Sequence, residues 1–294
     1  MTQPWTLGFI GAGVMAETMI AGLLAEGFEP ARIIASHRRA DRVEELAKHG
    51  ITASLDNRAA AAADVIVIAV KPQTLLPVLA GIEGALRPDA LVLSIVAGAR
   101  ISVLRRALKH ERVVRCMPNL PCRIRHGMTV WCAGAPAAAS PATSPTATLA
   151  ATPAALSFDD RMRIRSVLGV MGKEIEVDDE GHVDRATAVN GTGPAIVAHF
   201  VKAFLEAAAF IGEPRGVARE TVLETLAGTV EMIRRSDGHV AELIDEVTSP
   251  GGTTSRALQV LKNGRFSAVL TEAVDAAYQR TREMGDQLEK STGG

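Results

Sequence analysis

Apolar runs of strand length alternate with segments of helical periodicity over residues 1–180. The runs at 64–70 and 91–96 are apolar at nearly every position, which is typical of parallel strands covered on both faces. Strands that alternate with helices predict an α/β fold with a doubly wound, mostly parallel sheet. The strands are expected at residues 5–10, 32–36, 64–70, 91–96, 112–117, 127–132 and 174–177.

The rest of the chain shows helical periodicity and no strand pattern. We therefore predict two domains, a Rossmann-type domain at 1–180 and an all-helical domain at 181–294. The first long helical segment carries few charges and is expected to be buried, and the spare apolar faces are expected to mediate self-association. Apolar residues recur with spacings of three and four in the segments 196–205, 222–233, 240–247 and 266–277.

The segment at about 133–156 is rich in Ala, Pro, Ser and Thr. It has almost no large apolar or charged residues, so it can bury little surface and is predicted to be a mobile surface loop. A loop of this length is uncommon inside a domain.

The chain has 294 residues and a formal net charge of −1 at pH 7. This balance gives no electrostatic reason to expect nucleic acid or an anionic membrane as a partner. The longest apolar run, at 90–99, is too short to span a bilayer, and no cleavable leader is expected, which favours a cytoplasmic protein. Three cysteines without a Cys-x-x-Cys pair and scattered histidines argue against a disulfide framework or a metal site.

A glycine turn follows the first strand and opens a segment of helical periodicity. Its residues are Gly11, Ala12, Gly13, Val14 and Met15. Gly11 permits a tight turn, Gly13 lets the backbone approach a pyrophosphate, and the positive end of the following helix favours phosphate. In this context the turn predicts a dinucleotide-binding site.

The end of the second strand indicates which dinucleotide binds. The strand ends in Ser36, and Arg38 and Arg39 follow, with no acidic residue before Asp41. An NAD enzyme usually has a carboxylate there for the ribose 2′-hydroxyl, whereas a hydroxyl and guanidiniums suit a 2′-phosphate. We predict NADPH in preference to NADH, with Ser36 and Arg38 as ligands. The alternative is that the two arginines only begin a solvated helix.

Further strand ends are expected to line the same crevice, because the carboxyl ends of parallel strands meet at one edge of a sheet. Asn119 could offer its amide to the nicotinamide or the substrate, although an Asn beside Pro is often only a turn residue. The other candidates at these ends are Ala69, Val70, Lys71, Pro72, Ala97 and Gly98.

Two glycine turns in the helical half lead into helices. One begins at Asn190, and the other spans 247–255. Backbone amides at a helix N-terminus bind carboxylates as well as phosphates. The alternative for the second turn is that Thr253 or Thr254 simply caps its helix, and spacing leaves both interpretations open.

Together these motifs resemble those of the pyrroline-5-carboxylate reductase family. The resemblance covers nearly the whole chain, and the segment 247–254 is its most specific part. The other segments that carry it are 8–16, 69–73, 117–119 and 191–195.

The resemblance implies a Rossmann domain and a helical dimerisation domain, in dimers that often assemble into decamers. It also implies that NAD(P)H gives a hydride to the C=N carbon of a cyclic imino acid. The simplest case is 1-pyrroline-5-carboxylate to L-proline, the last step of proline biosynthesis. Thr254 would bond the imine nitrogen and Asn57 would lie near the NADP adenosine, in a site between subunits. The substrate would be held by Ser249, Gly251, Gly252, Thr253, Thr254, Asn119 and Asn190.

This chain departs from the family pattern at several positions. Leu120 and Cys122 replace Thr and Ala, Asn190 replaces Ser, and the insert after Ala133 is longer than expected. Leu120 and Asn190 change the polarity near the expected site, so the imine accepted could be a relative of pyrroline-5-carboxylate. Cys122 is expected to be a small packing residue rather than a reactive thiol.

Two other functions remain as alternatives. A β-hydroxyacid dehydrogenase shares the layout but needs a helix Lys near an Asn, and Lys202 is the only candidate, with no Asn following it. The other alternative is a non-catalytic NADP-binding protein, which only the changes at Leu120 and Asn190 support.

Overall fold

The computed structural model describes residues 4–134 and 156–292, so the Ala/Pro/Ser/Thr-rich insert lies almost entirely outside the described residues. The chain divides into two compact units. Unit 1 comprises Met1–Thr192 and Ala277–Gly294, and unit 2 comprises Gly193–Ala276.

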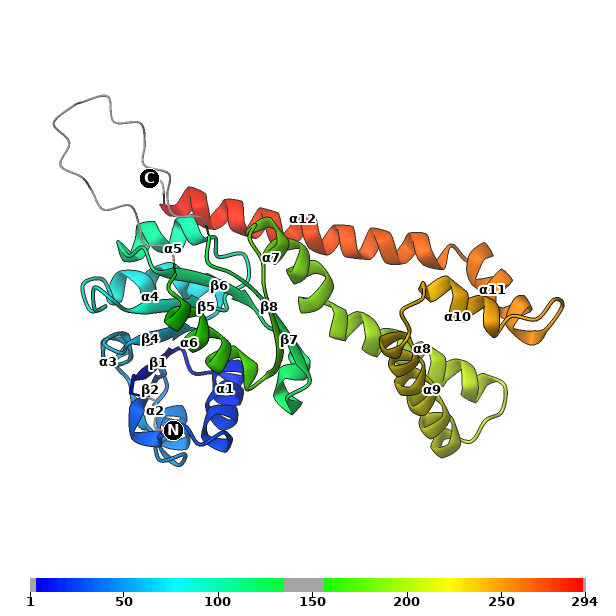
Figure 1. The fold of residues 1–294 in the computed structure, drawn as a ribbon, viewed down its shortest axis with the longest axis horizontal. Helices are drawn as coiled ribbons and strands as arrows, with labels where there is room; N and C mark the ends of the chain where they lie inside the picture. Colours follow the sequence, from blue (N-terminus) through cyan, green and yellow to red (C-terminus); the bar gives the residue numbers. More distant parts are fainter. Residues whose placement is uncertain (1–3, 135–155, 293–294) are drawn as a thin grey trace, which may run out of the picture. The chain divides into compact units, whose positions relative to one another are not determined.

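Unit 1 contains an eight-stranded sheet with the order β3-β2-β1-β4-β5-β6-β7-β8 (Figure 1). Neighbouring strands are parallel except β6 and β7, which are antiparallel. The predicted fold class is thus confirmed. The strands are β1 (Leu7–Ile10), β2 (Ile33–Ser36), β3 (Thr52–Ser54), β4 (Val65–Ile68), β5 (Leu91–Ser94), β6 (Val113–Met117), β7 (Gly127–Cys132) and β8 (Gly172–Glu176).

Helices cover both faces of this sheet, as its apolar strands require. Leu7 and Phe9 of β1 lie in one core cluster with α1, α2 and α6. Ile66 and Ile68 of β4 lie in a second cluster, on the other face, with α3, α4, α5 and α7. The helices are α1 (Val14–Ala25), α2 (Ala40–Ala47), α3 (Asn57–Ala61), α4 (Leu75–Gly81), α5 (Ile101–Leu108), α6 (Phe158–Gly169) and α7 (Gly181–Ala186).

Short helical turns complete unit 1 and mark the ends of several strands. Three are 3-10 turns, and the fourth, η4, is a π-helical turn. The strand order reverses direction between β1 and β4, and in such sheets ligands bind outside the carboxyl ends of the strands at this switch point. The turns are η1 (Pro30–Arg32), η2 (Pro72–Thr74), η3 (Leu120–Ile124) and η4 (Thr187–Gly191).

Unit 2 is entirely helical, and within residues 193–276 only Ala218 and Val222 are buried. The expectation that its first helix is buried is wrong for a single chain, since Phe200 and Phe204 are 39% and 41% exposed. Residues 181–210 are also long and apolar enough to cross a membrane, judged by length and composition alone. The helices are α8 (Gly193–Phe210), α9 (Arg215–Arg235), α10 (Val240–Glu246), α11 (Thr253–Asn263) and α12 (Phe266–Thr292), the last of which continues into unit 1.

Candidate active site

The first amides of the glycine turn after β1 form hydrogen bonds that fix the shape of the turn. The N–H groups of Gly11 and Ala12 donate to the Ser36 carbonyl at 3.1 and 2.9 Å, and the Gly13 N–H donates to the Gly11 carbonyl at 2.7 Å. The next amides, those of Val14 to Ala16, stand in the first turn of α1 and have no acceptor within the helix. An anion at this helix start would therefore meet the amides of residues 14–16.

The same turn packs directly against the loop after β4. Gly11 has a φ of 79°, and a Cβ added to it would lie 2.3 Å from Val70 Cγ1. The Ala69 N–H donates to the Ile10 carbonyl at 2.9 Å, which holds the two strand ends together. The structure thus brings together Gly11, Ala69 and Val70, three of the predicted cofactor residues.

Ser36 has a different environment from the one predicted. Its side chain is fully buried, and its Oγ lies 2.8 Å from Asn57 Oδ1 and 3.2 Å from the Phe9 carbonyl oxygen. The prediction that its hydroxyl faces a phosphate is corrected, because the strand directs this side chain into the protein. Ser36 instead contacts Asn57, the first residue of α3 and another predicted cofactor residue.

The residues after β2 form a basic surface. Arg38 is exposed and makes no ion pair with a described residue, whereas Arg39 is paired with Asp41. Partial burial, with the charges of Arg42, Arg39 and Arg38, lowers the pKa of His37. The exposed guanidinium of Arg38 suits an anionic group.

The loop after β5 is covered by the last turns of α12. A Cβ on Gly98 would lie 3.0 Å from Met284 Cβ, and Arg100 pairs with Asp286 and Glu289. Ala97 is half-buried and Gly98 is buried at this contact. After β4, Lys71 is exposed and Pro72 begins η2.

Asn119 and Asn190 are 71 positions apart in sequence and lie in contact. Asn119 Nδ2 donates to Asn190 Oδ1 at 2.8 Å. Asn190 Nδ2 in turn donates to the carbonyl oxygens of Met117 and Met128 at 3.2 and 2.9 Å. Asn119 and Asn190, which were predicted to bind the substrate, therefore form most of their hydrogen bonds within the protein.

The second predicted turn lies in unit 2 at the start of α11. Gly252 is the N-cap residue, without a side-chain cap, and Thr253 and Thr254 are the first two residues of the helix. The interpretation that Thr253 or Thr254 is the N-cap is therefore wrong. Gly251 has a φ of 72°, and the Gly252 N–H donates to the Ser249 carbonyl at 3.0 Å. The amides of the first helical turn are left available to an anion.

The described cysteines are not placed as reactive thiols. Cys122 is buried beside Asn119, and burial raises its pKa, which agrees with the packing role expected for it. Cys116 and Cys132 are also buried, and burial raises the pKa of each. A thiol with a raised pKa is a poor nucleophile at neutral pH. Among residues 4–134 and 156–292 no group of His, Cys, Asp and Glu side chains is arranged to hold a metal ion.

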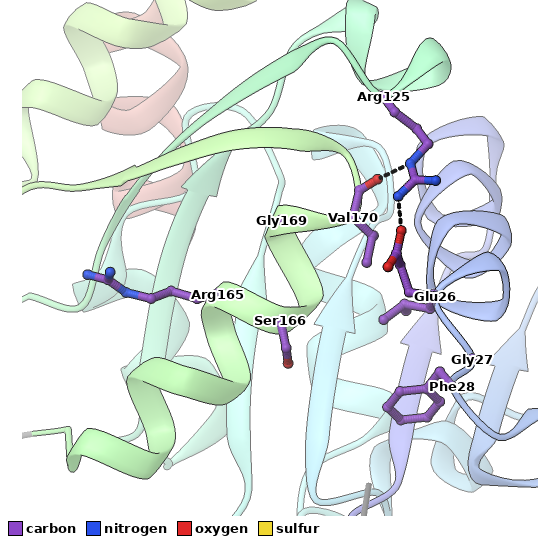
Figure 2. Close-up of a pocket in the computed structure, with 9 residues that line it drawn as sticks. Glu26, Gly27, Phe28, Arg125, Arg165, Ser166, Gly169 and Val170 are labelled. Carbon is purple, nitrogen blue, oxygen red and sulfur yellow. Dashed lines mark hydrogen bonds and ion pairs between the residues drawn. The ribbon is translucent and has the colours of Figure 1, made fainter. Parts of the chain in front are cut away.

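A cleft of about 390 Å³ lies at the far end of α1 from the glycine turn. Figure 2 shows Arg125 at its edge, reaching Glu26 and the Val170 carbonyl. Since α1 has 12 residues, this cleft is about 18 Å along the helix from the turn. It therefore lies away from the carboxyl edge of the sheet.

One ion cluster near the crevice was missed by the sequence analysis. Arg115 is 1% exposed inside β6 and donates to Glu180 Oε1 at 3.0 Å and Asp184 Oδ1 at 2.6 Å. Glu180 Oε1 also accepts the Ile101 N–H at 2.8 Å. A charged residue within an otherwise apolar strand was the available signal, because a buried charge needs partners.

Comparisons with known proteins agree on one family. A family model described as pyrroline-5-carboxylate reductase dimerisation matches residues 180–284, and one described as NADP oxidoreductase, coenzyme F420-dependent, matches residues 6–98. The chain is 36% identical to pyrroline-5-carboxylate reductase of Synechocystis, over 95% of this chain and 98% of that protein. It is 35% identical to the enzyme of that name from Pseudomonas aeruginosa, over 96% and 97% of the two chains.

Solved structures show the same likeness. The pyrroline carboxylate reductase of Plasmodium falciparum, solved with NADP bound, has a TM-score of 0.81 at 27% identity and covers 97% of this chain and 100% of its own. The pyrroline-5-carboxylate reductase of Coxiella burnetii has a TM-score of 0.79 at 30% identity, with 96% and 99% covered. Since full-length relatives, a dimerisation-domain model and the fold all agree, this chain belongs to the pyrroline-5-carboxylate reductase family.

Proposed function

We propose that this chain reduces the C=N bond of 1-pyrroline-5-carboxylate with NADPH and so forms L-proline. The observation that carries the proposal is identity of 35–36% to two enzymes of that name along nearly the whole chain. The glycine turn of α1 and the glycine turn of α11 supply the two kinds of ligand site that such a reaction needs. NADPH, when bound, supplies the hydride.

The residues at the carboxyl edge of the sheet fit a dinucleotide phosphate. The amides of Val14, Met15 and Ala16 and the positive end of α1 suit the pyrophosphate. Arg38 suits the 2′-phosphate because no described carboxylate neutralises its guanidinium. Gly13 leaves open space, since the nearest atom to an added Cβ is the Gly11 carbonyl oxygen at 3.9 Å. The strand-end residues at 69–72 and 97–98 line the same edge.

The start of α11 supplies what an imino acid needs. Its free amides and the glycine turn at 251–252 suit the substrate carboxylate, and Ser249 and Thr253 add hydroxyl groups. Thr254 orients the imine nitrogen through its hydroxyl. A protonated imine is already electrophilic, so orientation is the main task of the protein. No reactive cysteine is needed for this chemistry.

Self-association follows from the dimerisation domain. We infer that a second copy of the chain, rather than a membrane, covers the apolar surface of α8. A homodimer is the smallest such assembly, and a decamer is compatible with it. The net charge of −1 favours neither nucleic acid nor anionic lipid as a partner, and a cytoplasmic location agrees with this.

We place the boundary between the two functional domains at 180/181. The dimerisation model begins at residue 180, which supports this boundary. The contact-based division falls later, between Thr192 and Gly193, because α7 and η4 pack on β6 and β7 and so count with unit 1.

One assay tests the function directly. NADPH consumption is measured with 1-pyrroline-5-carboxylate and with its six-membered homologue. NADPH formation from NADP⁺ is measured with a panel of 3-hydroxy acids. Turnover of the five-membered imine alone, or in preference, is expected. Turnover of 3-hydroxy acids would favour the dehydrogenase alternative, for which Lys202 is the candidate base, although it is exposed and lies 3.6 Å from Glu206. Tight NADPH binding without turnover of any imine would contradict the proposal.

A further inference from the structure

Two asparagine side chains join three segments at the carboxyl end of β6. Asn119, just after β6, bonds Asn190 of η4, and Asn190 bonds the carbonyl oxygens of Met117 and Met128. Asn119 Oδ1 accepts the Met128 N–H at 3.0 Å. The amide pair therefore connects the end of β6, the start of β7 and the π-helical turn.

Most hydrogen-bonding groups of Asn119 and Asn190 already have protein partners, so few are free to bind a ligand. An amide side chain has two N–H donors and one oxygen acceptor. Both N–H groups and the oxygen of Asn190 have protein partners. The Asn119 oxygen accepts from Met128 and from the Cys122 thiol, whose Sγ lies at 3.7 Å. Of the four N–H groups of this pair, only the second N–H of Asn119 has no partner among the described residues.

The π-helical turn is fixed to one face of β6. Arg115 holds α7 through Glu180 and Asp184. Met117 lies two positions after Arg115 in β6, so its side chain is on the same face of the strand. It packs on Gly191 of η4. A Cβ on Gly191 would lie 2.5 Å from Met117 Cε, so the methionine side chain would have to move to admit a larger residue. The ion pairs, the methionine contact and the amide pair together set the position of η4.

We propose that Asn190 is a positioning residue, which holds the free N–H of Asn119 at the crevice edge and does not touch the substrate. The proposal rests on the proposed function. The carboxyl end of β6 is on the ligand side of the sheet, and π-helical turns are frequent at functional sites. The free N–H suits an acceptor oxygen, either of the nicotinamide carboxamide or of the imino acid carboxylate. Asn190 thus leaves the choice of imine unchanged, contrary to the effect expected from its change of polarity.

The test is a double-mutant cycle in the full-length enzyme, with Asn190→Ala, Asn119→Ala and the double variant. Measured quantities are kcat, KM for the imino acid and NADPH affinity by fluorescence titration. Each single variant is expected to lower kcat/KM by about 10-fold or more, because small misplacements are costly. The double variant is expected to be no worse than Asn119→Ala alone, because both act through one group. A loss of NADPH affinity would identify the nicotinamide carboxamide as the acceptor. A raised KM for the imino acid would identify its carboxylate.

A conservative variant sharpens the comparison. Asn190→Asp has the same shape but turns two donors into lone pairs that face the carbonyl oxygens of Met117 and Met128. It is expected to be at least as harmful as Asn190→Ala. If Asn190→Ala does not fold, Asn190→Ser, which has a small hydroxyl side chain, replaces it in the double-mutant cycle.

Three results would overturn the proposal. Losses that multiply in the double variant, or an altered preference between five- and six-membered imines in the Asn190 variants, would mean that Asn190 contacts the substrate itself. Lower thermal stability with unchanged kcat and NADPH affinity would leave Asn190 a structural residue only. A wild-type enzyme inactive on the imine would refute the proposed function instead. A loss of NADPH affinity that is the same in Asn119→Ala and in the double variant would still show that Asn190 acts through Asn119.

Discussion

Ser36 Oγ lies 2.8 Å from Asn57 Oδ1, and this contact connects the end of β2 to the first residue of α3. Both residues were predicted to meet the adenosine end of the cofactor. Because Ser36 is fully buried, we propose that its hydroxyl affects the cofactor only indirectly, through Asn57. We therefore expect the direct contacts to a 2′-phosphate to come from exposed groups after β2, above all from Arg38.

Arg38→Ala is expected to weaken NADPH binding by about 10-fold or more and to leave NADH binding nearly unchanged, because a charge-assisted bond to phosphate is lost. Arg39→Ala is the matched control, since Arg39 is already paired with Asp41 and should cost less. Dissociation constants for both nucleotides, measured by fluorescence titration, decide the point. Equal effects of the two substitutions would mean that the 2′-phosphate is bound elsewhere.

Ser36→Asp has a different expected outcome from the one that the sequence alone suggests. A carboxylate at a fully buried position must be desolvated beside the Phe9 carbonyl, so we expect lower stability rather than a clean change to NADH. Thermal unfolding of this variant beside Ser36→Ala separates charge burial from the loss of one hydrogen bond. A soluble Ser36→Asp enzyme with wild-type stability and a preference for NADH would contradict the buried geometry.

The two glycines of the turn are expected to fail in different ways. Gly11→Ala combines a φ of 79° with a Cβ 2.3 Å from Val70 Cγ1, so it should destabilise the apo protein by about 2 kcal/mol or more. Gly13→Ala has room in the apo protein and should leave its stability nearly unchanged, while its methyl group obstructs the pyrophosphate. Apo melting temperatures and NADPH affinities measure the two effects, and similar melting temperatures for both variants would count against this assignment.

The sheet could be predicted from the sequence because its central strands are apolar on both faces. Strand β3 was missed because Thr52–Ser54 has only three residues and polar ends. The burial of Ser36 was missed because a small polar residue at a strand end fits either direction. The partners of Arg115 follow it by 65 and 69 positions, and no local pattern connects such distant residues. Periodicity marked an apolar face on α8 but could not tell which chain covers it.

Thr254→Ala is expected to lower kcat by about 10²-fold and leave NADPH affinity nearly intact, because it removes only the hydroxyl that we propose orients the imine. Thr248→Ala is the control from the same segment, since the Thr248 hydroxyl already bonds the Ile244 carbonyl at 2.6 Å. Steady-state kinetics with nucleotide titrations distinguish the two variants. A parallel loss of turnover and NADPH affinity in Thr254→Ala would contradict the assigned role.

Phe200→Asp is expected to convert the assembly to monomers, because it places a charge on the apolar surface that we propose a partner chain covers. The Phe200 ring lies 5.9 Å from that of Phe204 and 6.3 Å from that of Phe266, so one substitution reaches the centre of this patch. Lys202→Ala is the control from the same helix. Lys202 forms an ion pair with Glu206 of its own chain, so its loss should leave the assembly intact. Sedimentation velocity at micromolar concentration gives the answer, and an unchanged coefficient for Phe200→Asp would place the interface elsewhere.

Asp64 joins the starts of β1 and β4, and its contribution to stability is expected to depend on pH. Burial alone would raise its pKa, but hydrogen bonds from the Thr6 N–H and hydroxyl, both at 2.7 Å, and the charge of Arg87 lower it overall. A carboxyl group with a pKa lower in the folded than in the unfolded state stabilises the protein fully above its unfolded value of about 3.9. That stabilisation is lost as the pH falls through the folded pKa.

Asp64→Asn is therefore expected to cost about 2 kcal/mol of unfolding free energy at pH 7 and progressively less below about pH 4. Asp89→Asn is the control, because Asp89 is exposed and its oxygen lies 3.7 Å from the same Arg87, whereas Asp64 lies at 2.8 Å. Urea unfolding at a series of pH values measures both differences. If the cost of Asp64→Asn stayed constant between pH 7 and pH 3, the ionised form of Asp64 would not be the source of its stabilisation, and hydrogen bonding by a neutral oxygen would account for it.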